Sequence, residues 1–216
     1  MPTPTRREAL SRERILRAAL SIVDREGLDA ISMRRVGEEL GVEAMSLYNH
    51  VANKAAMLDG IFEIVLAELP PAKGSKSWTL SLRERARALH EALRAHPNAL
   101  PLFSTRPAVT LASIAHVEGV LDELRKAGFS VDEALSALQV LVAFVVGHTV
   151  STHSPRLPGE ESHPRYEDLR EVEFPRVREA ARVLADHDVE KEFEFGLDAM
   201  LLGFEARHGG KRTGRR

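Results

Sequence analysis

The sequence predicts an all-α fold, and three observations support it. Ala, Leu, Glu and Arg, which favour helices, dominate the composition, and aromatic residues make up only 5% of the chain. Apolar residues recur at three- and four-residue spacing, whereas the alternating runs typical of strands are hard to find. The 216 residues are 44% hydrophobic, which is enough to build the core of one or two compact domains.

Two well-marked helices open the chain. Ser11 can cap a helix that runs to Glu26, and Ser32 can cap a second from Met33 to Leu40. Gly41 then ends the second helix, because glycine readily adopts the left-handed conformation at a helix end. The two helices are therefore expected to be joined by short turns.

Two further helices follow. The third is short and covers roughly residues 43–50, and Asn53 caps the fourth. Prolines at positions 70 and 71 end the fourth helix. Its apolar residues form a continuous stripe along one side: Leu58, Ile61, Phe62, Val65, Leu66 and Leu69.

A linker with turn residues, 70–77, leads to a longer helical body. Helices with N-caps, glycine ends or flanking prolines are expected along most of it, with irregular segments between them. The expected elements are a helix over 79–96, a short irregular stretch over 98–106, a helix from Pro107 at its first position to Gly128, a helix that Ser130 caps through Thr152, a mobile loop over 154–166, a helix over 175–187, and a last helix that Asp188 caps. The sequence thus predicts two domains, 1–58 and 59–216.

The composition excludes several classes of protein. The chain has no cysteine, so disulfides and thiolate metal sites are absent, and no metal or cofactor is expected. The N-terminus lacks the apolar region of a signal peptide, and the apolar run within 130–152 is interrupted by polar residues. We therefore expect a cytoplasmic protein without a membrane span.

Hydrogen-bonding side chains gather between residues 32 and 54. The second helix, the turn at Gly41 and the third helix form a helix-turn-helix, whose second helix lies in the DNA major groove. Ser46 can bond bases or phosphate, and Tyr48 offers a ring to a thymine methyl and a hydroxyl to phosphate. Asn49 and His50 add donors, and Arg34 is the candidate reader of guanine. Ordinary packing of Tyr48 and capping by His50 remain the structural alternative.

Lys54 is the most informative single residue of this group. It occupies the first position of the fourth helix, where the helix dipole disfavours a cation. An ammonium group beside free N–H groups makes an anion site, and a DNA phosphate would turn the repulsion into attraction.

The segment "LSIVDREGLDAISMRRVGEELGVEAMSLYNHVANKAAMLDGI" resembles the DNA-binding domain of the TetR family of tetracycline-repressor-like regulators. The resemblance implies that Ser32 caps the second helix, and that DNA contacts come from the residues matching Met33, Arg34, Ala44, Met45, Ser46, Tyr48, Asn49, His50 and Lys54. The chain departs from the tetracycline-responsive branch at Ala44 and Met45, where that branch has glutamine and proline. We therefore expect a different operator sequence.

The helix within 130–152 is apolar nearly all round, and the last helix is apolar over a wide arc. One protomer buries only part of such surfaces, so a four-helix interface between two copies is expected. The family resemblance implies the same homodimer, and a single large core without a dimer is the alternative.

The body should contain a pocket for a small molecule of apolar or amphipathic character. His116 and His148 are its best polar candidates, because each lies within an otherwise apolar helix and a buried imidazole needs a partner. Ordinary packing is the alternative for each candidate. The full candidate lining is Trp78, His90, Phe103, His116, Phe144 and His148.

These features favour a ligand-responsive homodimeric repressor that binds double-stranded DNA at a palindromic operator. A constitutive DNA-binding dimer without a ligand switch and a helical module that does not bind DNA are the alternatives. Family resemblance alone favours a repressor over an activator. No enzyme is expected, because "HEALRAH" is not the HExxH zinc motif and neither G-x-S-x-G nor a Walker loop is present.

Overall fold

The computed structural model describes residues 9–70, 77–154, 166–184 and 186–213, and every regular element in these ranges is a helix. The all-α prediction is therefore confirmed. The N-terminal elements are α1 (Arg12–Glu26), η1 (Leu28–Ala30), α2 (Met33–Leu40), α3 (Ala44–Leu47) and α4 (Lys54–Ala67). The body contains α5 (Trp78–Ala95), η2 (Pro97–Ala99), α6 (Leu100–Thr105), α7 (Leu111–Lys126), α8 (Val131–His153), η3 (Tyr166–Asp168), α9 (Pro175–Leu184) and α10 (Val189–Thr213).

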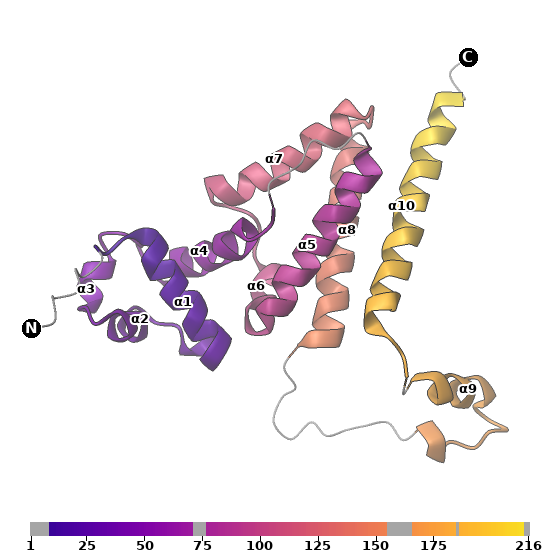
Figure 1. The fold of residues 1–216 in the computed structure, drawn as a ribbon, viewed down its shortest axis with the longest axis horizontal. Helices are drawn as coiled ribbons and strands as arrows, with labels where there is room; N and C mark the ends of the chain where they lie inside the picture. Colours follow the sequence, from indigo (N-terminus) through magenta and orange to yellow (C-terminus); the bar gives the residue numbers. More distant parts are fainter. Residues whose placement is uncertain (1–8, 71–76, 155–165, 185, 214–216) are drawn as a thin grey trace, which may run out of the picture.

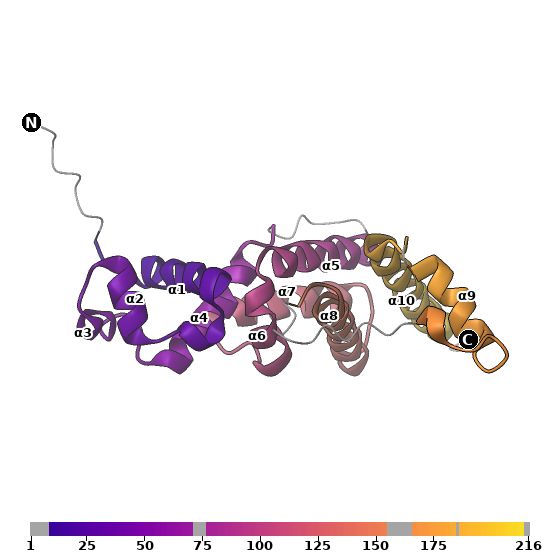
Figure 2. The ribbon, with the colours of Figure 1, turned by 90° about the horizontal axis from the view of Figure 1, so that it is seen from below.

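The molecule is elongated, with the N-terminal helices at one end and α9 and α10 at the other (Figures 1 and 2). Helix α4 leads from the N-terminal helices into the body, where α5, α7, α8 and α10 lie side by side (Figure 1). The predicted domain boundary between residues 58 and 59 falls inside α4.

The caps expected at the helix starts are present. The Ser11 hydroxyl accepts a bond from the backbone N–H of Arg14 at 3.2 Å, and Asn53 Oδ1 accepts one from Ala56 at 2.9 Å. Ser32 and Ser130 cap α2 and α8 in the same way. Each cap satisfies an N–H that the first helical turn leaves without a partner, which fixes the start of the helix.

Three predicted elements differ in the structure. Helix α3 ends at Leu47, and turns replace the helix expected as far as residue 50. The stretch expected to be irregular, 98–106, folds into the end of η2 and the helix α6. The expected start of α7 at Pro107 was wrong, because Thr110 and Ser113 form a capping box that begins the helix at Leu111. The linker 70–77 and the loop 154–166 lie largely outside the described residues.

Helix α8 is the central helix of the body and contacts α5, α6, α7 and α10. Its residues Leu141, Val145 and Val146 are buried among those helices. By length and composition alone α8 is the one helix within the described ranges that could cross a membrane. Packing within the protomer buries only 33% of its most apolar window, and Leu135 and Val140 remain exposed.

The helix-turn-helix is held together by two glycines of α2 and the turn after it. Gly41 adopts the left-handed conformation, with φ of 65°, and reverses the chain after α2. A Cβ on Gly37 would lie 2.9 Å from the carbonyl oxygen of Val42 and 3.2 Å from the backbone nitrogen of Ala44. Only a residue without a side chain therefore lets the start of α3 approach α2 this closely.

We expect Gly37→Ala to lower the free energy of unfolding by about 1–3 kcal/mol, because the new methyl group meets backbone that cannot rotate away. Thermal unfolding followed by circular dichroism measures the effect. Gly119→Ala in α7 is the matched control, since the nearest atom to its added Cβ would be an Arg85 nitrogen at an ordinary 3.7 Å. The control should be unchanged or slightly more stable. Equal stability of the two variants would contradict this account of Gly37.

Candidate nucleic-acid interface and ligand cavity

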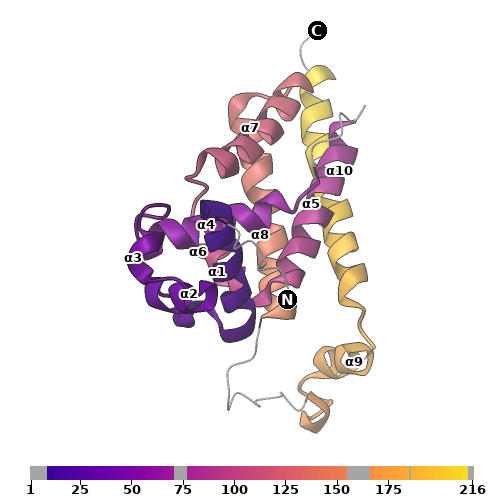
Figure 3. The ribbon, with the colours of Figure 1, turned by 60° about the vertical axis from the view of Figure 1, so that its left-hand side comes forward.

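Helix α3 is anchored by one buried residue and exposed elsewhere. Leu47 is completely buried in the N-terminal core with Val36 and Val51. On the outside, Met45 is 73% exposed and Tyr48 is 46% exposed. Figure 3 shows α2 and α3 together at the outer end of the N-terminal helices. The fold thus presents the second helix of the helix-turn-helix to solvent and not to the body.

The structure brings most of the predicted DNA-contact residues onto this outer surface. Ala44 and Ser46 are half-buried. Met33 differs, because its side chain is only 8% exposed and packs in the N-terminal core, so a side-chain contact from Met33 to DNA is not supported. The exposed members are Ser32, Arg34, Met45, Tyr48, Asn49, His50 and Lys54.

Arg34 already has a partner on its own helix. Its Nε donates to Glu38 Oε1 at 2.8 Å, and the two side chains are 87% and 53% exposed. An ion pair this exposed contributes little to stability, about 0–1 kcal/mol. Arg34 can therefore exchange Glu38 for an acceptor on a nucleic acid at small cost.

The N-terminus of α4 carries a free cation beside free donors. Asn53 caps the N–H of Ala56, while the N–H groups of Lys54 and Ala55 have no acceptor in the described part of the chain. The Lys54 side chain is exposed, and no carboxylate among the described residues pairs with it. Together with the positive end of the helix dipole, these groups form a site for an anion such as a phosphate.

Helix α2 is also fixed to α1 by ion pairs. Arg35 bonds to Glu26 at the end of α1 and contacts Glu39 within α2 at 3.0 Å. Arg25 of α1 reaches the same Glu39 at 3.0 Å. The hydrogen bond from Arg35 holds the pKa of Glu26 below its usual range. These contacts are exposed, so they orient α2 more than they stabilise it.

A cavity of about 670 Å³ lies within the body and reaches α4, α5, α7 and α8. Its wall is mainly apolar, and two of the six predicted ligand residues, Phe103 and His116, line it. The volume is typical of a site for a drug-sized molecule. The sequence reasoning missed its most polar members, which are Arg85, Arg106 and Gln139.

A periodicity signal for Arg85 was present in the sequence. Leu82, Ala86 and Leu89 are buried residues of α5, and Arg85 falls on the same face at the spacing i, i+3, i+4, i+7. A charged residue within an apolar stripe marks either a buried ion pair or a binding site.

The other four predicted ligand residues do not line the cavity. Trp78 packs its ring edge against Phe129, with ring centroids 4.9 Å apart. The remaining three, His90, Phe144 and His148, belong to a separate cluster between α5, α8 and α10.

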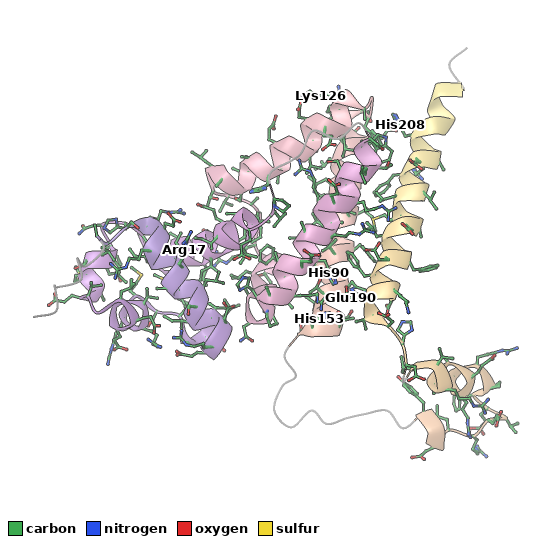
Figure 4. All side chains as sticks on the ribbon, in the orientation of Figure 1. Arg17, His90, Lys126, His153, Glu190 and His208 are labelled. Atoms are coloured by element: carbon green, nitrogen blue, oxygen red, sulfur yellow. The ribbon has the colours of Figure 1, made fainter. Side chains whose placement is uncertain are left out.

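His90 is at the centre of that cluster (Figure 4). Its ring stacks on Phe193 at 4.0 Å, and its Nδ1 lies 2.9 Å from the hydroxyl of Thr149. Glu190 Oε2 is 3.5 Å from its Nε2, and the His148 ring centroid is 5.4 Å away. No set of three His, Asp or Glu side chains in the described ranges has the geometry of a metal site.

Burial is the main cause of the altered titration of this cluster. It lowers the pKa of His90, and the nearby His148, Arg94 and His153 act in the same direction, while Glu190 opposes them. Burial also lowers the pKa values of His153 and His116. All three imidazoles are therefore neutral at pH 7.

Comparison with known proteins gives one consistent result. Residues 15–61 match the family described as "Bacterial regulatory proteins, tetR family", and residues 70–208 match "Tetracyclin repressor-like, C-terminal domain". The tetracycline repressor protein class D of Escherichia coli is 32% identical over 212 residues, which cover 92% of this chain and 90% of that relative.

Solved structures agree with the sequence comparison. Apo ActR from Streptomyces coelicolor has a TM-score of 0.81 and 30% identity, covering 94% of this chain and 98% of that one. ActR in complex with actinorhodin has a TM-score of 0.78 and 29% identity, covering 92% and 97%.

We expect the free energy of unfolding to fall as the pH is lowered from 7.5 to 5.5. The unfolded chain takes up protons near pH 6.5, whereas burial lowers the pKa of His90 in the folded chain. The free energy of unfolding therefore falls as the pH drops below 6.5, until folded His90 is protonated as well. One such imidazole accounts for at most about 1.4 kcal/mol per pH unit. Urea unfolding across this range measures the slope.

His90→Asn should flatten that slope, because asparagine keeps a polar group near Thr149 but does not titrate. Unfolding at pH 8, where imidazoles are neutral in both states, provides the baseline for each protein. An unchanged slope in the variant would show that His90 is not responsible.

Proposed function

The chain belongs to the TetR family of bacterial transcriptional regulators, and from this premise we propose that it is a homodimeric repressor. It binds a palindromic DNA operator in the cytoplasm and leaves it when a small molecule occupies the cavity. The family is one of non-enzymatic regulators, as the sequence predicted.

The observation that carries the DNA-binding role is the surface formed by α3 and the start of α4. Met45 is exposed on the helix expected in the major groove, and Tyr48 is exposed in the turn that follows it. Lys54 lies a few residues further along the chain, beside two free backbone N–H groups. Side chains for base edges and a site for phosphate therefore adjoin each other. This is the division of contacts that a sequence-specific DNA-binding protein requires.

Ala44 and Met45 set the expected operator apart from that of the tetracycline-responsive branch. Neither side chain can form the bidentate amide contact by which glutamine reads adenine. The exposed Met45 thioether and the Ala44 methyl group instead suit apolar contact with thymine methyl groups. We therefore propose an operator in which these positions are read by shape and apolar contact.

The support for a homodimer is an unpartnered apolar face on α10. Phe195 is 76% exposed and Leu202 is 65% exposed, with the small residues Ala199 and Gly203 on the same side of the helix. Val140 of the adjacent α8 is 49% exposed. Two copies that pair these helices would bury surfaces one protomer leaves in water, and would place two α3 helices on one duplex.

Helix α4 supports a route from the cavity to the DNA-binding surface. Its residues Met57, Ile61 and Val65 are buried in the N-terminal core, whereas Phe62 and Leu66 line the cavity. The apolar stripe of α4, which the sequence predicted as one continuous face, therefore packs partly in the N-terminal core and partly against the cavity. A ligand that displaces the cavity side of α4 would also move the side that packs in the N-terminal core against α1.

Two contacts connect the cavity wall to α4. Phe62 stacks on Phe103 of α6 with ring centroids 4.5 Å apart. Arg106, just after α6, bonds to Asp59 of α4 at 2.5 Å. A coupling free energy of about 1–3 kcal/mol through such contacts would change operator affinity roughly 5–150-fold. The cavity and this connection favour a ligand-responsive repressor over a constitutive DNA-binding dimer.

We expect Lys54→Ala to weaken binding to all DNA sequences and to reduce the slope of log affinity against log salt by about 1, because one phosphate contact is lost. Arg34→Ala should instead relax preference at one base pair by about 1–3 kcal/mol. Fluorescence anisotropy with operator fragments, first selected from genomic DNA, measures both effects.

Lys126→Ala is the matched control for Lys54→Ala. Lys126 is an exposed lysine at the end of α7, far from α3 and paired with Asp122 (Figure 4). Its removal should leave the salt slope unchanged. If neither Lys54→Ala nor Arg34→Ala alters DNA binding, the proposed interface is wrong.

We expect Leu202→Glu to convert the dimer to a monomer, because it places a charge within the apolar face of α10. Sedimentation equilibrium measures the mass, and affinity for the palindromic operator should fall with the dimer. Val172→Glu is the control, since Val172 is 97% exposed and lies outside that face. A monomeric wild-type protein, or a dimer that survives Leu202→Glu, would contradict the proposed interface.

A further inference from the structure

The wall of the cavity is cationic as well as apolar. Arg85, Arg106 and His116 line it, and no Asp or Glu does so among the described residues. The cavity is otherwise formed by side chains such as Phe62 and Phe103. A bound cation or metal chelate would therefore meet positive charge and no carboxylate.

Arg106 is not available to a ligand as a free charge. Its guanidinium bonds to Asp59 at 2.5 Å, and the two side chains are 28% and 24% exposed. A partly buried pair of this kind is already neutralised. Arg85 is the more weakly paired of the two arginines, because its contact with Glu123 is 3.7 Å long.

Arg85 forms an ion pair with Glu123 but leaves its Nε without a hydrogen bond. Its Nε is buried and has no hydrogen-bond partner. Glu123 Oε2 is the nearest carboxylate oxygen at 3.7 Å, beyond hydrogen-bond distance, and that oxygen already accepts a 2.7 Å bond from Ser81. A buried donor without an acceptor is unfavourable, so an acceptor that the Arg85 guanidinium could turn toward would stabilise it.

His116 of α7 supplies a second donor near Arg85. Burial lowers the pKa of His116, and the positive charge of Arg85 lowers it further. The imidazole is therefore neutral at pH 7 and donates a single N–H. It adds a hydrogen bond to this part of the wall without adding charge.

We propose that the cavity accepts an organic acid: a drug-sized apolar or aromatic body with an oxyanion that pairs with Arg85. This inference rests on the proposed function, because it assigns the chemical class of the effector. The planar fork of a guanidinium matches a carboxylate or similar oxyanion, and the apolar walls accept the remainder of the molecule.

Two fluorescent probes test the charge preference directly. Anilinonaphthalene sulfonate and N-phenylnaphthylamine share one aromatic body, and only the first bears an anion. We expect each to displace the other from the wild-type dimer. In Arg85→Gln the Kd of the sulfonate should rise about tenfold, while the Kd of the neutral amine should stay within roughly threefold.

Two further variants control for structure. Arg87→Gln lies on the same helix, where Arg87 pairs with Glu194 on the surface, and it should not change either Kd. Arg85→Lys keeps the charge but loses the fork, so it should give an intermediate loss for the sulfonate alone. If Arg85→Gln does not fold, Arg85→Lys carries the test.

An equal change for both probes, or no change for either, would overturn the inference, as would failure of the probes to displace each other or to bind the wild type. Operator binding by the same proteins without probe is measured in parallel. If the probes fail but the proteins still bind the operator, only the assigned ligand class is wrong. If the wild-type protein binds no DNA, the proposed function itself is wrong.

Discussion

The structure depends on one helix, α4, that is packed in two environments at once. Met57 and Ile61 are completely buried in the N-terminal core, where α4 packs against α1, and Phe62 and Leu66 reach the cavity of the body. A helix moves largely as a rigid unit, because its backbone hydrogen bonds resist bending. A displacement of α4 would therefore alter both sets of contacts, which is the physical basis of the proposed connection between the two parts of the chain.

The helix starts could be predicted from the sequence where they depend on interactions between residues close together in the chain. Ser11, Ser32 and Asn53 each cap the helix that they were expected to cap, because a cap joins groups three residues apart. The start of α7 was misplaced because Thr110 and Ser113 compete with the proline signal at Pro107, and only the geometry shows which one begins the helix.

The DNA-binding surface was easier to predict from the sequence than the cavity, because its residues are close together in the chain. The predicted DNA contacts in and after α3 occupy a short continuous segment, in which Leu47 is buried and the predicted contact residues are exposed or half-buried. The cavity is assembled from five helices, and residue type alone placed Phe103 and His116 in it but also included His90 and His148. Which face of α5 or α8 meets the cavity is decided by packing between helices distant in sequence.

The pair between Arg34 and Glu38 has a consequence for how such a protein would search a chromosome. On most DNA, Arg34 would have to give up a 2.8 Å contact without finding a guanine edge in exchange. Glu38 would also repel nearby phosphates. This repulsion would shorten binding to other sequences more than binding to the operator, because only the operator offers Arg34 a guanine in exchange. If Arg34 contacts DNA as proposed, a carboxylate that contributes almost nothing to folding stability would shorten the time spent on competing sites relative to the time spent on the operator.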